Sequence, residues 1–439
     1  MRSSAFGIVL VATLSCGGAV VACTSHEGAT SGGSGDAGGS SGTSGTSGAS
    51  GTSGASGTSG TSGTSGTSGT SGTSGTSGSS GDPDAGTSGD GGDTGAPAVQ
   101  LIGRFDDTDA AGPRFAWPGT RIIARFDGTD VSVKLTQTNG FTGGPTYFDV
   151  VFDGVVETPF TVSGTQTIVL ASGKPAGTHT IEIMKRTEAV FGTVRFEGFT
   201  FSGGTGLLAP PARAARKMEF LGDSTIDGYG IEGDHATTCM VGGVDTAPPQ
   251  YDEARKSVAW LTSVGVGAEL NLLAYSGKGL ARNEDGQSTD TYPTLYTRTL
   301  PDVAGSAWSF ATFTPDAVVA ALGGADYSGD PSGTFPANFD ASYAAMIADI
   351  RAHYGATPYV FLLVWSQYKA YDGVRQAITA AIDAAIAGRP AGEKNVKIVL
   401  PESDISTDET GCQLHGNAAH HAAMSILVIK AIKDATGWP

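Results

Sequence analysis

The chain is poor in basic residues. Its 439 residues include 26 Lys and Arg against 43 Asp and Glu, a formal net charge of −17. Nucleic-acid binding depends on clustered Lys and Arg, so this balance argues against a nucleic-acid partner. Cysteine is scarce as well, with only four in the whole chain.

The N-terminus lacks a long unbroken hydrophobic run. Its apolar stretch, "MRSSAFGIVLVATLSCGGAVVAC", is short and interrupted by glycine, which argues against a membrane span. One basic residue followed by such a stretch is typical of an export signal. The end of the stretch, "VVAC", resembles a bacterial lipobox, in which cleavage precedes a cysteine that then carries lipid. We expect a signal peptide over residues 1–22 and a lipidated Cys23. Cys16 is a poorer candidate, and an ordinary cleaved signal is the alternative.

Once the leader is removed and Cys23 carries lipid, only Cys239 and Cys412 are left to pair. An even pair in an exported protein predicts one disulfide.

Residues 23–96 lack almost every apolar side chain. They consist mainly of Gly, Ser, Thr, Ala and Asp, with "TSG" repeated through Gly78. Glycine at every third position is shared with collagen, but the other positions carry Thr, Ser and Ala rather than Pro, so a triple helix is not expected. Because this segment can bury no apolar area, the sequence predicts a disordered linker.

Short β-rich runs separated by turn residues fill residues 97–208. No helical periodicity lies between them, a pattern that favours an all-β sandwich of jelly-roll type. The runs are 99–105, 121–126, 131–137, 147–154, 166–171, 178–186 and 194–201.

Residues 209–439 alternate apolar strands with helical segments. Such alternation predicts a parallel sheet covered on both faces, an α/β/α doubly wound domain. The expected strands are 217–221, 269–275, 316–322, 358–364 and 396–400, and the expected helices are 257–266, 339–354, 374–388 and 417–436.

Ligands of doubly wound domains bind at the carboxyl ends of the strands, and several reactive groups fall there. Ser224 follows the first strand in "GDSTIDGYG", and Gly277 follows the second in "SGKG". A late loop histidine, His415, lies in "GCQLHGN". A serine attacks a carbonyl when a base removes its proton and N–H donors receive the oxyanion. The N–H groups of Ser224 and Gly277 are candidate donors.

These blocks resemble the SGNH (GDSL-type) hydrolases, and in particular carbohydrate esterase family 2, which couples a β-sandwich to an SGNH domain. The resemblance covers the chain from about Val99 to Pro439. It rests on "GRFDDTDAAGPRFAWPGTRIIARFDGT", "GDSTIDGYG", "YSGKGLARN", "LYTRTL" and "GCQLHGN" in this order. It implies a Ser224 nucleophile, a His415 base, and oxyanion donors at Ser224 and Gly277.

Two positions depart from the pattern of the family. Ala325, in "LGGAD", stands where the family places an asparagine that donates to the oxyanion. Gln413 stands where an acid often orients the histidine. Members of the family are known to work with a Ser–His dyad, so a backbone carbonyl or Gln413 could orient the ring.

Other polar and aromatic residues have more ordinary interpretations. Asp223 and Asp227 suit turn and cap positions, and Asp326 is expected to close its loop. Trp365, at a strand end, is a candidate for sugar stacking, with burial in the core as the alternative. The histidines near the C-terminus lack the spacing of a metal site, so neither metal nor other cofactor is expected.

The resemblance implies a serine esterase that removes O-acetyl groups from a polysaccharide of xylan or mannan type, at the bacterial surface or on the periplasmic side of the membrane, lipid-anchored or secreted. A neutral polymer is compatible with the acidic net charge. Two alternatives stay open: a degenerate esterase that survives as a carbohydrate-binding protein, for which Ala325 is the motive, and a generic GDSL lipase.

Overall fold

The computed structural model describes residues 96, 98–140, 144–366, 373–401 and 409–439. Residues 90–439 form one compact unit. The predicted signal peptide, Cys23 and the linker lie outside the described residues, except for position 96.

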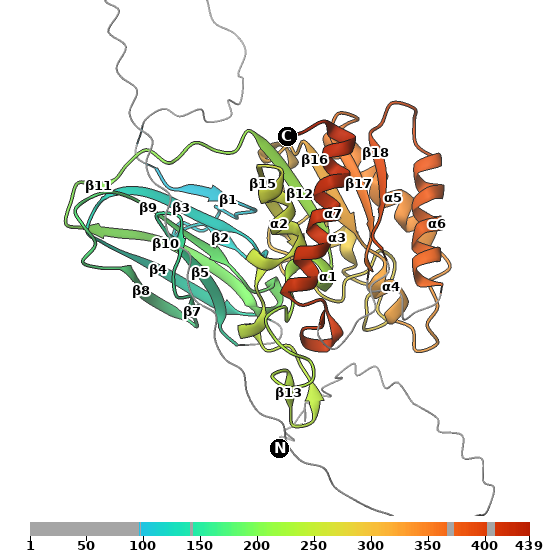
Figure 1. Cartoon of the computed structure of the whole chain (residues 1–439), viewed down its shortest axis with the longest axis horizontal. Helices are drawn as coiled ribbons and strands as arrows, with labels where there is room; N and C mark the ends of the chain where they lie inside the picture. The colour runs from blue at the N-terminus through green and yellow to red at the C-terminus, as the bar shows by residue number, and fades with distance from the viewer. Residues whose placement is uncertain (1–95, 97, 141–143, 367–372, 402–408) are drawn as a thin grey trace, which may run out of the picture. The chain divides into compact units, whose positions relative to one another are not determined.

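Two antiparallel sheets form the first half of this unit (Figure 1). The larger sheet has the order β1 (Gln100–Ile102), β3 (Arg121–Gly128), β9 (Gly177–Lys185), β5 (Thr146–Phe152) and β6 (Val155–Val156), with β11 (Gly206–Leu207) on β3 and β7 (Phe160–Val162) on β5. The smaller sheet has the order β2 (Arg114–Phe115), β10 (Gly192–Ser202), β4 (Asp130–Asn139) and β8 (Thr165–Ala171).

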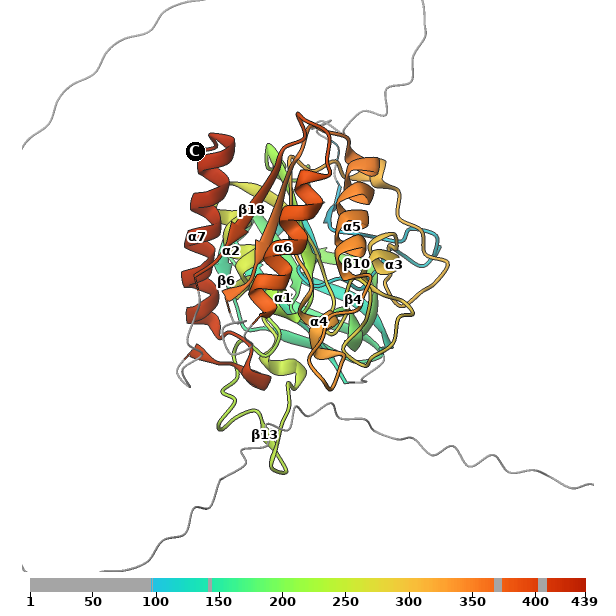
Figure 2. The ribbon, with the colours of Figure 1, turned by 90° about the vertical axis from the view of Figure 1, so that its right-hand side faces the viewer.

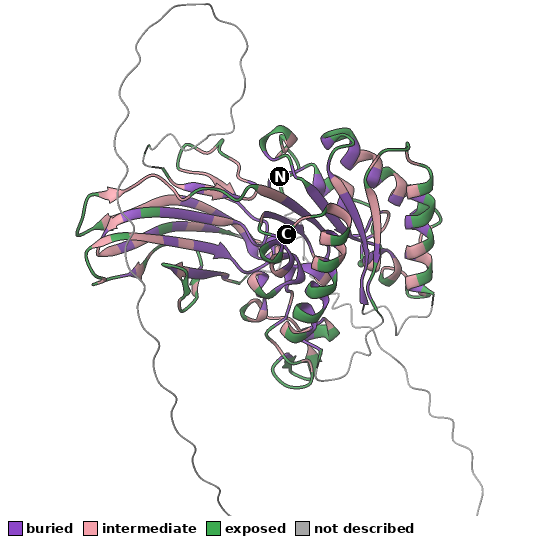
Figure 3. Cartoon of the chain, turned by 45° about the horizontal axis from the view of Figure 1, so that its top comes forward, coloured by how far each residue is buried: buried purple, intermediate pink, exposed green. Residues whose placement is uncertain are grey.

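Alternation of apolar and polar residues explains how the two sheets pack. In β4, Val131, Val133 and Leu135 point inward and are at most 1% exposed. They contact buried residues of the larger sheet in one core, and Figure 3 shows buried residues (purple) along the strands of the sandwich. A strand with a period of two buries one face and solvates the other, so the sequence pattern produces a sandwich.

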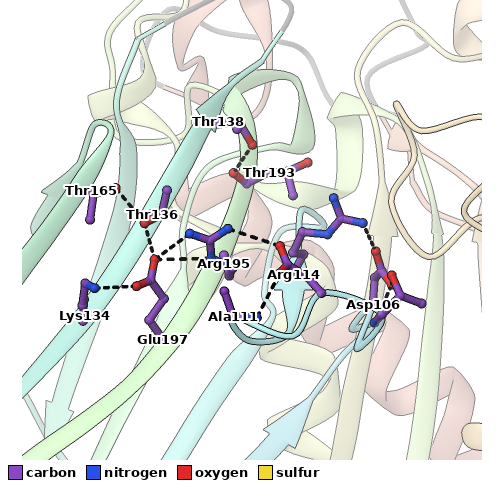
Figure 4. Close-up of polar contacts among 12 residues, drawn as sticks. Asp106, Ala111, Arg114, Lys134, Thr136, Thr138, Thr165, Thr193, Arg195 and Glu197 are labelled. Carbon is purple, nitrogen blue, oxygen red and sulfur yellow. Dashed lines mark hydrogen bonds and ion pairs between the residues drawn. The ribbon is translucent and has the colours of Figure 1, made fainter.

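Charged residues and threonines cover the outer face of the smaller sheet (Figure 4). Glu197 accepts from Lys134 Nζ at 2.7 Å and from Arg195 Nη2 at 2.9 Å, and Arg195 Nη1 reaches Asp109 at 3.2 Å. Such exposed ion pairs add little stability. Their effect is to keep this face polar.

The second half is a parallel sheet of five strands. Its order is β15 (Ala268–Ala274), β12 (Arg216–Gly222), β16 (Ala317–Ala321), β17 (Tyr359–Val364) and β18 (Asn395–Val399). In chain order this is 2-1-3-4-5, the flavodoxin-like arrangement, whose switch point lies between the first and third strands.

Helices cover both faces of the sheet (Figure 2). One core contains α2 (Val258–Gly265) and α7 (Ala418–Thr436), and the other contains α3 (Tyr292–Tyr296), α5 (Phe339–Tyr354) and α6 (Val374–Ala387). The remaining helices, α1 (Ser224–Asp227) and α4 (Gly324–Ser328), are single turns after β12 and β16. All five predicted strands and all four predicted helices of this domain are present.

The sandwich and the α/β domain share buried contacts. Trp117 of the sandwich is fully buried in the core that contains α5 and α6, and Met184 is fully buried in the core that contains α2 and α7. Arg104, also fully buried, lies 3.4 Å from Glu219 of β12 and donates to the carbonyl oxygen of Arg298 at 2.8 Å. The two domains therefore fold against each other. No helix of the described residues is long and apolar enough to cross a membrane.

Candidate active site

The turn after β12 places Ser224 at the carboxyl edge of the sheet. Asp223 caps α1, because its Oδ1 accepts from the N–H of Thr225 at 3.0 Å and from its hydroxyl at 2.7 Å. Gly228 ends the turn in the left-handed region, with φ of 90°. Asp223 is buried beneath the loop. It acts as a cap, as the sequence predicts, and Ser224 lies next to the switch point of the sheet.

Ser224 and His415 are in direct contact. The hydroxyl oxygen of Ser224 lies 2.7 Å from His415 Nε2, and His415 Nδ1 lies 3.1 Å from the carbonyl oxygen of Gln413. Because a carbonyl only accepts, Nδ1 carries the proton and Nε2 is free to accept from the serine. Burial lowers the pKa of His415 below its usual value. The neutral ring is the form that can serve as a base.

The side chain of Gln413 does not orient this ring. Its Oε1 accepts from the hydroxyl of Tyr229, and its Nε2 donates to the carbonyl oxygen of Asp245 at 3.2 Å. The residue adopts φ of 50° and ψ of 39°, and its carbonyl is the group that meets His415. Of the two alternatives that the sequence leaves open, the structure therefore has the backbone carbonyl.

A disulfide and a hairpin hold the loop of His415. Cys239 pairs with Cys412, as the cysteine count predicts. The hairpin of β13 (Met240–Val241) and β14 (Val244–Asp245) begins directly after Cys239, and Asp245 Oδ1 accepts from the N–H of Gln413 at 3.0 Å. The loop is thus anchored at Cys412 and at Gln413, directly before His415.

The two other strand-end loops are joined by Asp326. Its carboxyl oxygens accept from the N–H groups of Leu280 at 2.7 Å, Ala281 at 2.7 Å and Arg282 at 3.0 Å. Asp326 is therefore structural, as expected, but it ties its own loop to the loop after β15 instead of closing its own loop. Ala325, beside it in α4, is buried and 5% exposed.

Gly277 lies in the loop after β15, in the left-handed region with φ of 71°. Its carbonyl oxygen accepts from the N–H of Glu284 at 2.9 Å. A Cβ on Gly277 would lie 3.2 Å from Glu284 Oε2, so this carboxyl group packs beside the candidate donor. Desolvation, and then the charges of Asp223 and Asp285, raise the pKa of Glu284. Glu284 directly follows the block "YSGKGLARN", but no pattern in the sequence assigned it a role.

Trp365 is not a sugar platform. It is 1% exposed and packs edge-on against His420, with ring centroids 5.6 Å apart. The stacking prediction is wrong because the end of β17 lies under α7. His421 Nδ1 accepts from the N–H of Val258 at 3.0 Å. Within the described residues no group of three or more His, Cys, Asp or Glu side chains is placed to hold a metal ion.

Comparison with known proteins shows the family to which the chain belongs. The profile of the carbohydrate esterase 2 N-terminal domain matches residues 101–211. A solved structure of a family two carbohydrate esterase from Clostridium thermocellum, in complex with cellohexaose, is 32% identical with a TM-score of 0.69, over 78% of this chain and 100% of that one. A family 2 enzyme from Corynascus thermopiles is 28% identical, with a TM-score of 0.67, over 78% of this chain and 100% of that one. The fold and the site define an SGNH-type hydrolase. The chain belongs to carbohydrate esterase family 2.

Two curated relatives are longer than the matched region. The cellulase/esterase CelE of Acetivibrio thermocellus is 32% identical over 78% of this chain. The matched region covers 40% of that protein. The acetylxylan esterase/glucomannan deacetylase of Cellvibrio japonicus is 29% identical over 53% of this chain, which spans 62% of that protein.

The state of His415 can be measured without reference to activity. Burial lowers the pKa of His415, whereas hydrogen bonds to the carbonyl of Pro175 and to Asp153 raise the pKa of His179. We expect NMR titration of the imidazole resonances to give a midpoint below 6.5 for His415 and above 6.5 for His179. The reverse order would contradict the geometry described here.

Proposed function

We propose that this protein is a serine esterase that removes O-acetyl groups from a polysaccharide. The observation that carries the proposal is the 2.7 Å contact between Ser224 Oγ and His415 Nε2 at the carboxyl edge of the sheet. The names of the relatives, which include an acetylxylan esterase/glucomannan deacetylase, support acetyl esters of xylan or mannan type as the substrate class.

The reaction follows from the positions of these groups. Ser224 Oγ attacks the acetyl carbonyl carbon while His415 Nε2 takes its proton. The N–H groups of Ser224 and Gly277 donate to the oxygen that becomes negative. His415 then returns the proton to the departing sugar hydroxyl, which leaves an acetyl-serine. Water, deprotonated by the same histidine, releases acetate and restores the serine.

With a carbonyl oxygen instead of a carboxylate at His415 Nδ1, the protonated imidazole that forms in this reaction is less stabilised. The Gln413 carbonyl fixes the tautomer of His415, but it brings no full negative charge to stabilise the imidazolium. The enzyme is accordingly a dyad enzyme.

Ala325 favours a second candidate, a degenerate esterase that binds carbohydrate without turnover. Its methyl group supplies no donor where the family has an amide. Comparison of wild type with Ser224→Ala on an aryl acetate separates the two.

Ser224→Ala and His415→Ala are each expected to abolish acetate release, and the loss in the double variant should equal that of either single variant, because the two residues act as one unit. Gln413→Ala should cost much less, since its backbone carbonyl remains. Acetate release from acetylated xylan and from 4-nitrophenyl acetate is the measurement. Near wild-type turnover by Ser224→Ala would reject the esterase function.

Ala325→Asn is expected to raise kcat by up to about tenfold with little change in KM, because an amide donor there would act on the transition state. Ala325→Leu is the matched control: it fills a similar volume and donates nothing. If both variants fold and Ala325→Asn has no higher kcat than Ala325→Leu, groups outside this position donate to the oxyanion.

We also propose that the sandwich is a jelly roll and that the chain is exported as a lipoprotein. Successive long strands, β3, β4, β5, β8, β9 and β10, alternate between the two sheets, as jelly-roll connections do. The proposal of a lipoprotein rests on the sequence "VVAC", which directly precedes the predicted linker. Cys23→Ser should move the protein from the membrane fraction to the soluble fraction, whereas Cys16→Ser should not. Retention of the Cys23 variant in membranes would exclude this anchor.

A further inference from the structure

A buried carboxyl group of the sandwich reaches into the candidate active site. Glu188 follows β9 and precedes the short 3-10 turn Ala189–Phe191, and it is 1% exposed. Its Oε2 accepts from the N–H of Ser276 at 2.7 Å, and its Oε1 accepts from the hydroxyl of the same serine at 2.6 Å. Ser276 directly precedes Gly277 in the loop after β15.

The contact between Glu188 and Ser276 limits the direction of the Gly277 N–H, the candidate oxyanion donor, because only one rotatable bond lies between them. The N–H of Gly277 belongs to the peptide group that joins it to Ser276, and that peptide is planar. With the N–H and hydroxyl of Ser276 both held, only rotation about ψ of Ser276 separates the fixed atoms from the Gly277 N–H. On the other side, the Gly277 carbonyl accepts from Glu284 N–H at 2.9 Å. The donor is therefore fixed from both directions.

We propose that Glu188 is a positioning residue of the oxyanion site, through which the β-sandwich sets the direction of the Gly277 N–H. This inference rests on the proposed esterase function. It assigns the sandwich a part in the reaction itself, rather than in binding alone.

The surroundings of Glu188 fix the turn that carries it, and although burial raises the pKa of its carboxyl group, the two bonds from Ser276 oppose that shift. Lys185 Nζ donates to the carbonyl oxygens of Thr187 at 2.6 Å and Glu188 at 2.7 Å, which fixes the turn that carries Glu188. Burial, and then the charges of Glu188 and Asp252, raise the pKa of Asp227 well above its usual value. Asp227 is thus close enough to Glu188 for each carboxyl group to affect the pKa of the other. Since Asp227 ends α1, the same cluster also contacts the turn of Ser224.

Glu188→Gln tests the inference with little change in volume. A glutamine retains one acceptor, but its amide NH₂ would face one of the two Ser276 donors. We expect kcat on 4-nitrophenyl acetate to fall about 10- to 100-fold, because small misplacement of a catalytic donor costs up to about 10². KM should change less than about threefold. Loss confined to KM, or no loss, would overturn the inference.

Glu182→Gln is the matched control. Glu182 lies on β9 of the same sandwich and accepts from Arg255 Nη2 of the α/β domain at 2.6 Å, but it has no contact with the loop of Gly277 among the described residues. If Glu188 only joined the two domains, both variants would lower the melting temperature and kcat alike. We expect both to fold and only Glu188→Gln to lose kcat.

Ser276→Ala approaches the same contact from the other side and serves if Glu188→Gln fails to fold. It removes the hydroxyl bond, keeps the N–H bond, and should lower kcat several-fold, with Ser276→Thr restoring it. An unchanged kcat in a folded Ser276→Ala variant would also overturn the inference.

The activity of the wild-type protein shows whether the proposed function fails or only this inference fails. Wild type and Ser224→Ala would then be equally inactive, which rejects the esterase and this inference together. An active wild type with an unaffected Glu188→Gln rejects the inference alone.

Discussion

Carboxyl groups that accept backbone N–H bonds fix the loops of the candidate site that the structure describes. Each loop leaves the sheet with several N–H groups that have no partner in a strand or helix, and such groups are costly to bury unbonded. One side-chain carboxyl group can accept from more than one backbone N–H group, and it thereby fixes the position of the loop. The pairs are Asp223 with Thr225, Asp326 with Leu280, Ala281 and Arg282, Glu188 with Ser276, Asp252 with Gly230, and Asp245 with Gln413. Part of the acidic excess of the chain is thus internal, and most of these acids do no chemistry of their own.

The base loop combines this constraint with a covalent one. Cys412 is bonded to Cys239, Asp245 holds the next residue, and the carbonyl of Gln413 then meets His415 Nδ1. Gln413 adopts a positive φ, which a non-glycine residue does at a cost of order 1–3 kcal/mol. The disulfide and the hairpin resist relaxation of that conformation. Orientation of the histidine therefore depends on backbone held in place by its neighbours, and a substitution of the Gln413 side chain leaves the orienting atom present.

The sequence predicted the parts of this protein that repeat with a period and missed those that depend on distant contacts. The strands and the long helices follow from apolar periodicity, Ser224 and Gly277 follow from blocks at strand ends, and His415 follows from a block in the loop before the last helix. Trp365 was ambiguous because a strand end can be open or covered, and here α7 covers it. Glu188 carried no local signal, since its partner lies 88 residues away on another domain. The choice between the carbonyl and side chain of Gln413 likewise depended on Tyr229 and Asp245, which no local pattern connects to it.

The cores that the two domains share limit the exchange of these domains between proteins. Binding modules attached through a linker can be exchanged between enzymes, because each has a complete surface of its own. Here Trp117 and Met184 complete cores that belong to the α/β domain, and Arg104 lies beside a glutamate at its centre. A sandwich cut from this chain would leave cavities in its partner and expose its own aromatic side chain. We therefore expect the sandwich and the α/β domain to be exchanged between proteins only together, as one unit.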